Sequence, residues 1–270
     1  KDWLDSTAVL VRPTIHSLCT LKIDSHCGRD LLNLKPRKMP YKHLFFDWDH
    51  TLWDFEKNSE MSLRNLFEDL GLQSLGIPSF EVFFEKYIAI NDVKWELYRN
   101  GKIDKQTLRE TRFRETFAHF GAVDDALAWS LETRYIAETP YQNHLIEGTR
   151  EVLHALKERG YIFHVITNGF QESQNIKFSE SGLQPLFDVL LCSDQVGVNK
   201  PDPKIFRRAL QLAGAKRKES LMIGDNLIAD CVGARNEGID QVFFNPKSQR
   251  HTQSLTYEIT TLTELLDILP

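Results

Sequence analysis

Cysteine is scarce in this sequence: its 270 residues include four, and no two of them form a CxxC pair. Such sparse use argues against a disulfide-rich secreted scaffold and is typical of a reducing cytoplasm, which we expect to be the location of the protein. Cys192 and Cys231 are predicted to be small buried side chains.

Long apolar runs and an excess of positive charge are also missing. No apolar run approaches the length that crosses a bilayer, so no membrane partner is expected. The formal net charge of −5 argues against a broad basic surface for a nucleic acid polymer. A small anionic substrate would therefore need a local cation or a metal ion. Contents of 41% hydrophobic and 26% charged residues are ordinary for a globular protein, without internal repeats or low-complexity tracts.

The first 38 residues differ from the rest of the chain. They begin with Lys1, alternate short apolar and polar stretches and contain no long apolar signal core. Met39 stands directly before Pro40-Tyr41-Lys42, which lead into the first predicted strand. We therefore expect a native domain that starts near Met39, and an N-terminal extension over 1–38 that is either poorly ordered or foreign to that domain.

Hydrophobic periodicity divides the remainder into two kinds of structure. His43 to Phe46 is an apolar run typical of a buried strand, and toward the C-terminus strand and helix patterns alternate. Between them, the segment 55–141 has apolar residues at three-and-four spacing, which glycines divide into roughly four helices. This order predicts an α/β fold: a parallel sheet with helices over 39–54 and 142–270, interrupted after its first strand by a helical unit that packs by itself.

Two aspartates, Asp47 and Asp49, directly follow the first predicted strand. Parallel sheets place their chemistry at the carboxyl ends of the strands, and residues two apart on an extended segment point the same way. The two carboxylates would therefore crowd each other unless a divalent cation or a shared proton offsets their repulsion. The alternative is a pair of turn aspartates that caps the next element.

The sequence Thr167-Asn168-Gly169 follows the second predicted strand. It offers a hydroxyl, an amide and a glycine that lets the backbone approach a ligand closely, which suits an oxyanion such as phosphate. The alternative is an ordinary helix cap and turn.

Two further charged clusters follow the third and fourth predicted strands. Lys200 stands just ahead of a helix that Asp202 is predicted to cap, where nearby prolines restrict it, although a solvated surface lysine is the default for this residue type. Asp225 and, one helical turn later, Asp230 form an acidic pair that suits a hard cation, with helix capping by Asp225 as the alternative.

The four clusters occur in one order, each at the end of a strand, and together they resemble the four motifs of the haloacid dehalogenase-like (HAD) hydrolase superfamily. The matching residues are Asp47-Trp48-Asp49-His50-Thr51, Thr167-Asn168, Lys200-Pro201, and Gly224-Asp225 with Asp230. The resemblance covers residues 43 to about 245. It implies a Rossmann-like core with the helical segment 55–141 as a cap of the C1 type.

The resemblance implies catalytic roles for the paired aspartates. Asp47 would be the nucleophile that attacks a phosphate monoester and forms an aspartyl-phosphate, and Asp49 would protonate the leaving oxygen and then activate water. Mg²⁺, the implied cofactor, would be held by the Asp47 carboxylate, the Asp49 backbone carbonyl and Asp225, with Thr51 behind these ligands. Dehalogenases of the superfamily lack an acid at the position of Asp49, because halide leaves without a proton.

The other matched residues would bind or orient the phosphoryl group. Thr167 and the backbone of Asn168 and Gly169 would hold its oxygens, and Lys200 would stabilise charge on it and on the nucleophile. Asp230 would orient Lys200 or a metal-bound water.

Within the superfamily, the chain looks similar to the pyrimidine 5′-nucleotidase-like branch, so a nucleoside 5′-monophosphate is the expected substrate. The similarity lies in the sequence from Ile166 to Gln174, in the stretch before Pro201, and in the cap around Trp95 and Arg112. Trp95 could stack on a base and Arg112 could meet an anion or a carbonyl, with cap core and a surface ion pair as the alternatives. Neighbouring branches act on phosphoglycolate, sugar phosphates and acylneuraminate 9-phosphate.

A non-catalytic binding module is the alternative from another functional class. Such a protein would be expected to have lost one of the charged motif residues, and all four are present: Asp47, Asp49, Lys200 and Asp225. We therefore expect an enzyme that acts on a small phosphorylated metabolite as a monomer or a homodimer.

Overall fold

The computed structural model describes residues 41–270, and the predicted extension over 1–38 lies outside them. Along the chain the elements are β1 (His43–Phe46), α1 (Phe55–Asp69), the 3-10 helix η1 (Leu72–Leu75), α2 (Phe80–Arg99), α3 (Lys105–His119), α4 (Asp125–Glu138), η2 (Thr139–Tyr141), α5 (Thr149–Glu158), β2 (Ile162–Thr167), α6 (Gln171–Glu180), η3 (Gln184–Leu186), β3 (Phe187–Cys192), η4 (Ser193–Gln195), α7 (Pro203–Ala213), η5 (Arg217–Glu219), β4 (Ser220–Gly224), the π-helical η6 (Leu227–Val232), α8 (Gly233–Asn236), β5 (Asp240–Phe244), β6 (Tyr257–Ile259), η7 (Leu262–Glu264) and α9 (Leu265–Ile268).

The strands form one parallel sheet, which confirms the predicted α/β fold. Their order is β3-β2-β1-β4-β5-β6, so β1 lies in the middle between β2 and β4. This arrangement brings the carboxyl ends of β1, β2 and β4, and the polar clusters that follow them, to one edge of the sheet.

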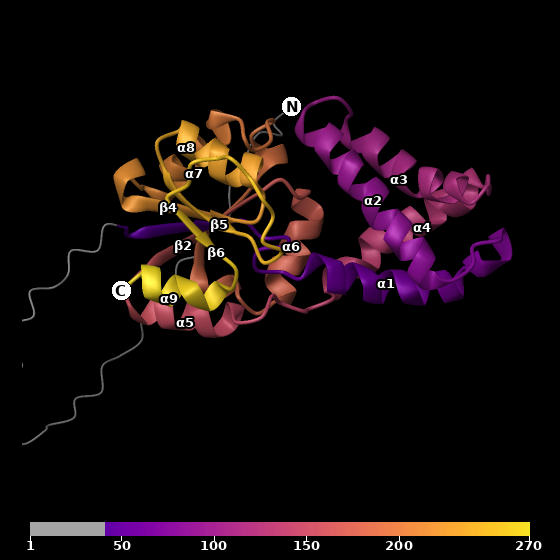
Figure 1. The fold of residues 1–270 in the computed structure, drawn as a ribbon, viewed down its shortest axis with the longest axis horizontal. Helices are drawn as coiled ribbons and strands as arrows, with labels where there is room; N and C mark the ends of the chain where they lie inside the picture. The colour runs from indigo at the N-terminus through magenta and orange to yellow at the C-terminus, as the bar shows by residue number, and fades with distance from the viewer. Residues whose placement is uncertain (1–40) are drawn as a thin grey trace, which may run out of the picture.

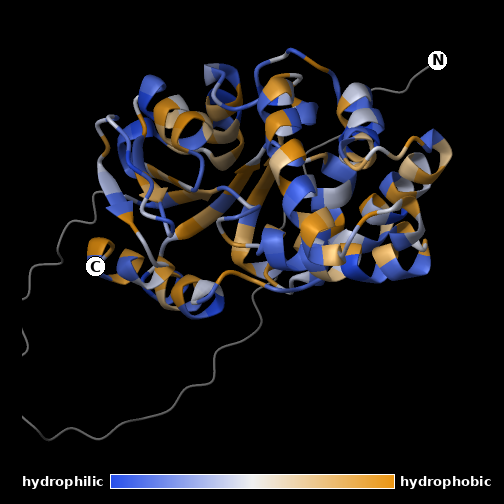
Figure 2. Cartoon of the chain, turned by 45° about the vertical axis from the view of Figure 1, so that its right-hand side comes forward, coloured by the Kyte–Doolittle hydropathy of each residue, from blue (hydrophilic) through white to orange (hydrophobic). Residues whose placement is uncertain are grey.

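Both faces of the sheet are covered because side chains alternate along each strand. In β1, Leu44 and Phe46 belong to the core formed with α5 and α9, whereas Phe45 belongs to the core formed with α7 and α8. Figure 1 shows these two pairs of helices on opposite sides of the sheet. In Figure 2 the strands at the centre are largely apolar, and the helices around them carry both apolar and polar residues.

The helices α1 to α4 pack as a separate group beside the sheet (Figure 1). They have a core of their own that includes Leu63, Phe83, Phe113 and Leu131. Four residues accept a hydrogen bond from a backbone N–H at the start of these helices and define where each begins: Asp54, Ser79, Asp104 and Asp124.

Two chain segments connect this helical group to the sheet, and they run side by side. The Asp54 amide donates to the His144 carbonyl at 3.0 Å, and the Ile146 amide donates to the Leu52 carbonyl at 3.0 Å. Both segments lie next to the motif that contains Asp49. The helical group is therefore anchored at the edge of the sheet where the polar clusters meet.

Several local predictions are confirmed, and two features of the structure were not predicted. Asp202 caps α7 with Pro203 in its first turn, and Cys192 and Cys231 are buried. A sixth strand, β6, was not predicted, because Tyr257–Ile259 has only three residues with a charged glutamate in the middle. The other such feature is the π-helical segment η6 (Leu227–Val232), which directly precedes the short helix α8 (Gly233–Asn236). None of the helices in residues 41–270 combines the length and apolarity that crossing a membrane requires.

Candidate active site

Asp47 and Asp225 stand at the carboxyl ends of two neighbouring strands. The pairing of β1 with β4 continues one residue beyond β1, since the Asp47 amide donates to the Ile223 carbonyl at 2.9 Å. Thr51 ties the two ends together: its hydroxyl donates to Asp225 Oδ1 at 3.1 Å and accepts from the Asp225 amide at 3.1 Å. The first and fourth motifs therefore hold each other in place.

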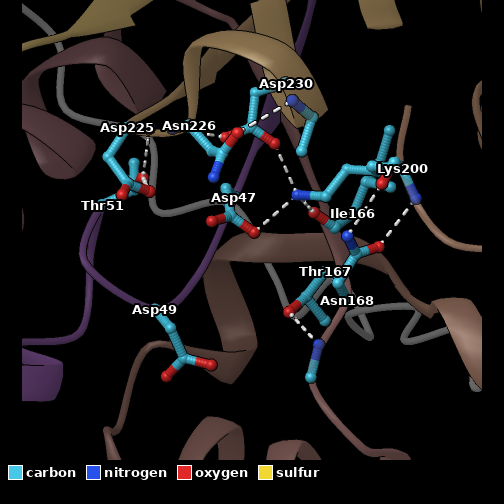
Figure 3. Close-up of polar contacts among 12 residues, drawn as sticks. Asp47, Asp49, Thr51, Ile166, Thr167, Asn168, Lys200, Asp225, Asn226 and Asp230 are labelled. Atoms are coloured by element: carbon cyan, nitrogen blue, oxygen red, sulfur yellow. Dashed lines mark hydrogen bonds and ion pairs between the residues drawn. The ribbon is translucent and has the colours of Figure 1, made fainter. Parts of the chain in front are cut away.

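The ammonium group of Lys200 lies between two carboxylates (Figure 3). Its Nζ is 2.6 Å from Asp47 Oδ1 and 2.7 Å from Asp230 Oδ1, and it donates to the Ile166 carbonyl at 2.7 Å. Burial alone lowers the pKa of Lys200, but the carboxylates of Asp230 and Asp47 outweigh burial and raise that pKa above its ordinary value. Lys200 is therefore a fixed cation that orients Asp47.

Three carboxylates at this edge of the sheet fit a divalent cation. One oxygen each of Asp47, Asp225 and Asp230 lies within 4.8 Å of the others. Burial raises the pKa of Asp47 to about 6, although Lys200 opposes it, and burial likewise raises the pKa of Asp225 to about 6. Because Oδ2 of Asp230 accepts from the Asn226 amide at 3.0 Å and its Oδ1 faces Lys200, Asp47 and Asp225 are the better placed ligands for Mg²⁺.

Asn168 fixes the segment that carries Lys200. Its Nδ2 donates to the Lys200 carbonyl at 3.0 Å, and its Oδ1 accepts from the Lys200 amide at 2.8 Å. The neighbouring Thr167 hydroxyl accepts from the Gly169 amide at 3.0 Å and from Gln174 Nε2 at 2.9 Å, so its own proton is free for a ligand. A side chain at Gly169 would come within 1.9 Å of Gln174, which explains the glycine.

Asp49 lies at the same edge of the sheet, but its carboxylate turns away from Asp47 (Figure 3). Lys177 Nζ lies 2.6 Å from Oδ1, and Gln174 Nε2 donates to Oδ2 at 2.6 Å. The Lys177 ammonium also lies 4.0 Å from the centre of the Trp53 ring. Both oxygens of Asp49 are therefore held by α6.

A cavity of about 510 Å³ opens between the edge of the sheet and the helical group. This volume is typical of sites for small molecules. Asp47, Asp49 and Lys200 line it from the sheet, and Asn91 and Trp95 line it from α2. The indole of Trp95 packs against the Phe170 ring, with 5.1 Å between the ring centres.

Arg112 does not line this cavity, which differs from the substrate contact expected from the sequence. It is 4% exposed, and its guanidinium donates to both carboxylate oxygens of Glu132, at 2.7 and 2.9 Å. A third hydrogen bond of 3.2 Å joins its Nη1 to Oδ1 of Asn91. The positive charge of Arg112, which was expected to meet a substrate anion or carbonyl, is instead paired with the buried carboxylate of Glu132.

Sequence reasoning did not predict that Gln174 and Lys177 would bind Asp49, or that Asn91 would line the cavity. Gln174 and Lys177 are three residues apart and therefore share a face of α6, which is a signal that the helical pattern contains. No local signal connects them to Asp49, which is 128 residues from Lys177 along the chain.

Comparison with known proteins agrees with this geometry. The profile of the haloacid dehalogenase-like hydrolase family matches residues 41–238. The chain is 36% identical over 234 residues to the pyrimidine 5′-nucleotidase PynA of Streptococcus pneumoniae, covering 86% of this chain and 96% of that protein. It is 31% identical to the pyrimidine 5′-nucleotidase YjjG of Escherichia coli, covering 86% and 99%.

A solved structure gives the same result for the fold. The putative HAD-hydrolase YfnB of Bacillus subtilis, crystallised with magnesium, superimposes with a TM-score of 0.76 at 30% identity. The match covers 85% of this chain and 98% of that one, so it includes both the sheet and the helical group.

Proposed function

The chain belongs to the haloacid dehalogenase-like hydrolase family and is a phosphatase of that family, and we propose that it hydrolyses a nucleoside 5′-monophosphate through an aspartyl-phosphate on Asp47, with Mg²⁺ as cofactor. The observation that carries the proposal is the contact of 2.6 Å between Lys200 Nζ and Asp47 Oδ1 in a cavity that also contains Asp49.

Asp47 is the proposed nucleophile. Lys200 holds its Oδ1, whereas no described residue within 41–270 donates a hydrogen bond to its Oδ2. Oδ2 would form the new bond to phosphorus as the bond from phosphorus to the leaving oxygen breaks. The free proton of the Thr167 hydroxyl supplies a donor for a phosphoryl oxygen, which supports this orientation of the substrate.

Asp49 is the proposed proton donor and acceptor. It would protonate the departing oxygen, and then remove a proton from the water that hydrolyses the aspartyl-phosphate. Since Lys177 and Gln174 hold its carboxylate away from Asp47, a rotation of this side chain would accompany substrate binding.

Mg²⁺ would be held by the carboxylates of Asp47 and Asp225 and by the Asp49 backbone carbonyl, and it would neutralise charge on the phosphoryl oxygens. The fit of these carboxylates to a cation supports this assignment. We further propose that the segment 55–141 acts as the cap, because its α2 helix forms one wall of the cavity.

A nucleotide is proposed as substrate over the other phosphate monoesters for two reasons. PynA and YjjG, similar over nearly their whole lengths, are pyrimidine 5′-nucleotidases. The cavity also has an aromatic wall at Trp95, which suits a planar base rather than phosphoglycolate, a sugar phosphate or acylneuraminate 9-phosphate.

A phosphatase screen with Mg²⁺ tests the proposal. We expect kcat/KM for uridine and thymidine 5′-monophosphates to exceed that for phosphoglycolate and for sugar phosphates by at least about 10-fold. Activity confined to phosphoglycolate or sugar phosphates would contradict the nucleotide assignment and leave the mechanism intact. Failure to hydrolyse any phosphate monoester would support a binding module.

A further inference from the structure

We propose that Nδ2 of Asn91 is the donor that selects substrates whose leaving group carries a ring carbonyl oxygen, and that buried Arg112 fixes it in this role. The proposal rests on the proposed function, because it identifies how the same cavity distinguishes a pyrimidine nucleotide from other phosphate monoesters.

Asn91 has one amide atom bound and one available. It lies on α2 and lines the cavity that contains Asp47. Its Oδ1 accepts from Arg112 Nη1 at 3.2 Å, and the Tyr87 hydroxyl lies 3.5 Å from the same atom. Because an arginine has donors only, the oxygen of the amide must face Arg112 and the NH₂ group must face the other way.

The NH₂ group of Asn91 has no partner among residues 41–270, although the residue is only 2% exposed. The Nδ2 atom is not fully enclosed by protein atoms. Because Asn91 lines the cavity, the exposed side of this NH₂ group faces the cavity. A ligand that places an acceptor at this point therefore forms a hydrogen bond with Nδ2 that no described residue within 41–270 forms.

Arg112 prevents the amide from turning over. Its guanidinium donates twice to Glu132, a residue that is 0% exposed, and is itself buried in the cap. A planar guanidinium held in this way cannot lose its proton or become an acceptor. The side of Asn91 that faces the cavity is therefore a donor only.

The neighbouring side chain indicates what kind of group carries the acceptor. Trp95 lies four residues after Asn91 on α2, so the two side chains share one face of the helix and line one cavity. An aromatic surface beside an amide donor suits a flat ring with a carbonyl oxygen in its plane. Pyrimidine bases have such carbonyls, whereas a sugar phosphate in its ring form has neither a carbonyl nor a flat ring.

Asn91→Asp is the direct test, with Asn65→Asp as the matched control. The first substitution keeps the shape and the acceptor that faces Arg112 but removes the NH₂ group. The second makes the same change on an exposed position of the cap helix α1. We expect the ratio of kcat/KM for uridine 5′-monophosphate to that for ribose 5-phosphate to fall about 10-fold or more in Asn91→Asp, mainly through KM, and to stay within about twofold in Asn65→Asp.

Thiocarbonyl analogues give a second measurement. It compares two substrates within each protein, so a difference in stability between wild type and variant does not affect it. Sulfur is a weak acceptor, so either the 2-thio or the 4-thio derivative of uridine 5′-monophosphate should react with lower kcat/KM than the parent in the wild type. The same derivative should show no such loss in Asn91→Asp. Two outcomes would refute the role of Asn91 and leave the proposed nucleotidase function intact. They are an unchanged selectivity ratio in a folded Asn91→Asp variant, and equal thio effects in both proteins. A wild type without preference for uridine 5′-monophosphate over ribose 5-phosphate would overturn both this inference and the proposed nucleotidase function.

Discussion

Replacement of Lys200 by Met perturbs the site at its centre. Met has a similar length but no charge, so the variant retains the packing and loses the ammonium group. In the wild type, Lys200 is 2% exposed and lies 2.6 Å from Asp47 and 2.7 Å from Asp230, which is 0% exposed. The variant leaves both carboxylates buried without their cation.

The expected cost follows from that geometry. Removing one partner of a buried ion pair destabilises a protein by about 3–5 kcal/mol, because the remaining charge is neither solvated nor paired. We expect a loss of this size in the free energy of unfolding at pH 7.5 without Mg²⁺. The loss should be smaller at pH 5, because burial raises the pKa of Asp47 to about 6 and a protonated carboxyl no longer needs a cation. We also expect kcat to fall about 100-fold or more.

Urea denaturation at the two pH values, with EDTA present, measures these losses. Lys204→Met is the matched control, because Lys204 is an exposed lysine on α7, and its effect should stay within about 0.5 kcal/mol. A loss below about 1 kcal/mol for Lys200→Met at pH 7.5, or the same loss at both pH values, would refute the reasoning.

Three further predictions concern the metal, the proton donor and the sheet. Mg²⁺ should raise Tm more at pH 7.5 than at pH 5. Burial raises the pKa of Asp47 and of Asp225 to about 6, so their ionisation destabilises the metal-free fold as pH rises through 6, and below pH 6 protons compete with the metal for the same carboxylates. Equal shifts in Tm at the two pH values would contradict this prediction. Lys177→Met should lower kcat/KM for alkyl phosphates about 10-fold but barely affect kcat/KM for 4-nitrophenyl phosphate, whose leaving group needs no proton; equal losses of kcat/KM would oppose a positioning role on Asp49. Burial lowers the pKa of His164 to about 3, so only the unfolded state gains a proton as pH falls below about 6.5. The stability advantage of wild type over His164→Gln should therefore shrink by about 1.6 kcal/mol from pH 6.5 to 5 in urea titrations, and a constant advantage would disprove this origin.

The sheet was predictable because its strands are short apolar runs that end in polar motifs. The rule that parallel strands align their carboxyl ends brings Asp47, Thr167 and Asp225 to one edge without any knowledge of the fold's details. The strand β6 was not predictable in the same way, because at an edge only one side pairs and Tyr257–Ile259 has no continuous apolar run.

The cap side of the cavity was less accessible to sequence reasoning. Arg112 is a charged residue on a helix, and nothing in its local sequence indicates that Glu132, on the next helix, will bind it in the core of the cap. Asn91 acquires its function from that pair, so its position could be found only after the packing of α2, α3 and α4 was known. Helical spacing specifies which residues share a face but not which helix that face meets.

The most direct test of the account is to locate the phosphoryl group during turnover. We expect acid quenching of the wild type with Mg²⁺ and uridine 5′-monophosphate, followed by mass spectrometry of the peptides, to find a phosphorylated Asp47. The Asp47→Asn variant should fold, carry no phosphoryl group and show no turnover. A phosphoryl group on another residue, or near-normal hydrolysis by Asp47→Asn, would contradict the central claim that Asp47 is the nucleophile.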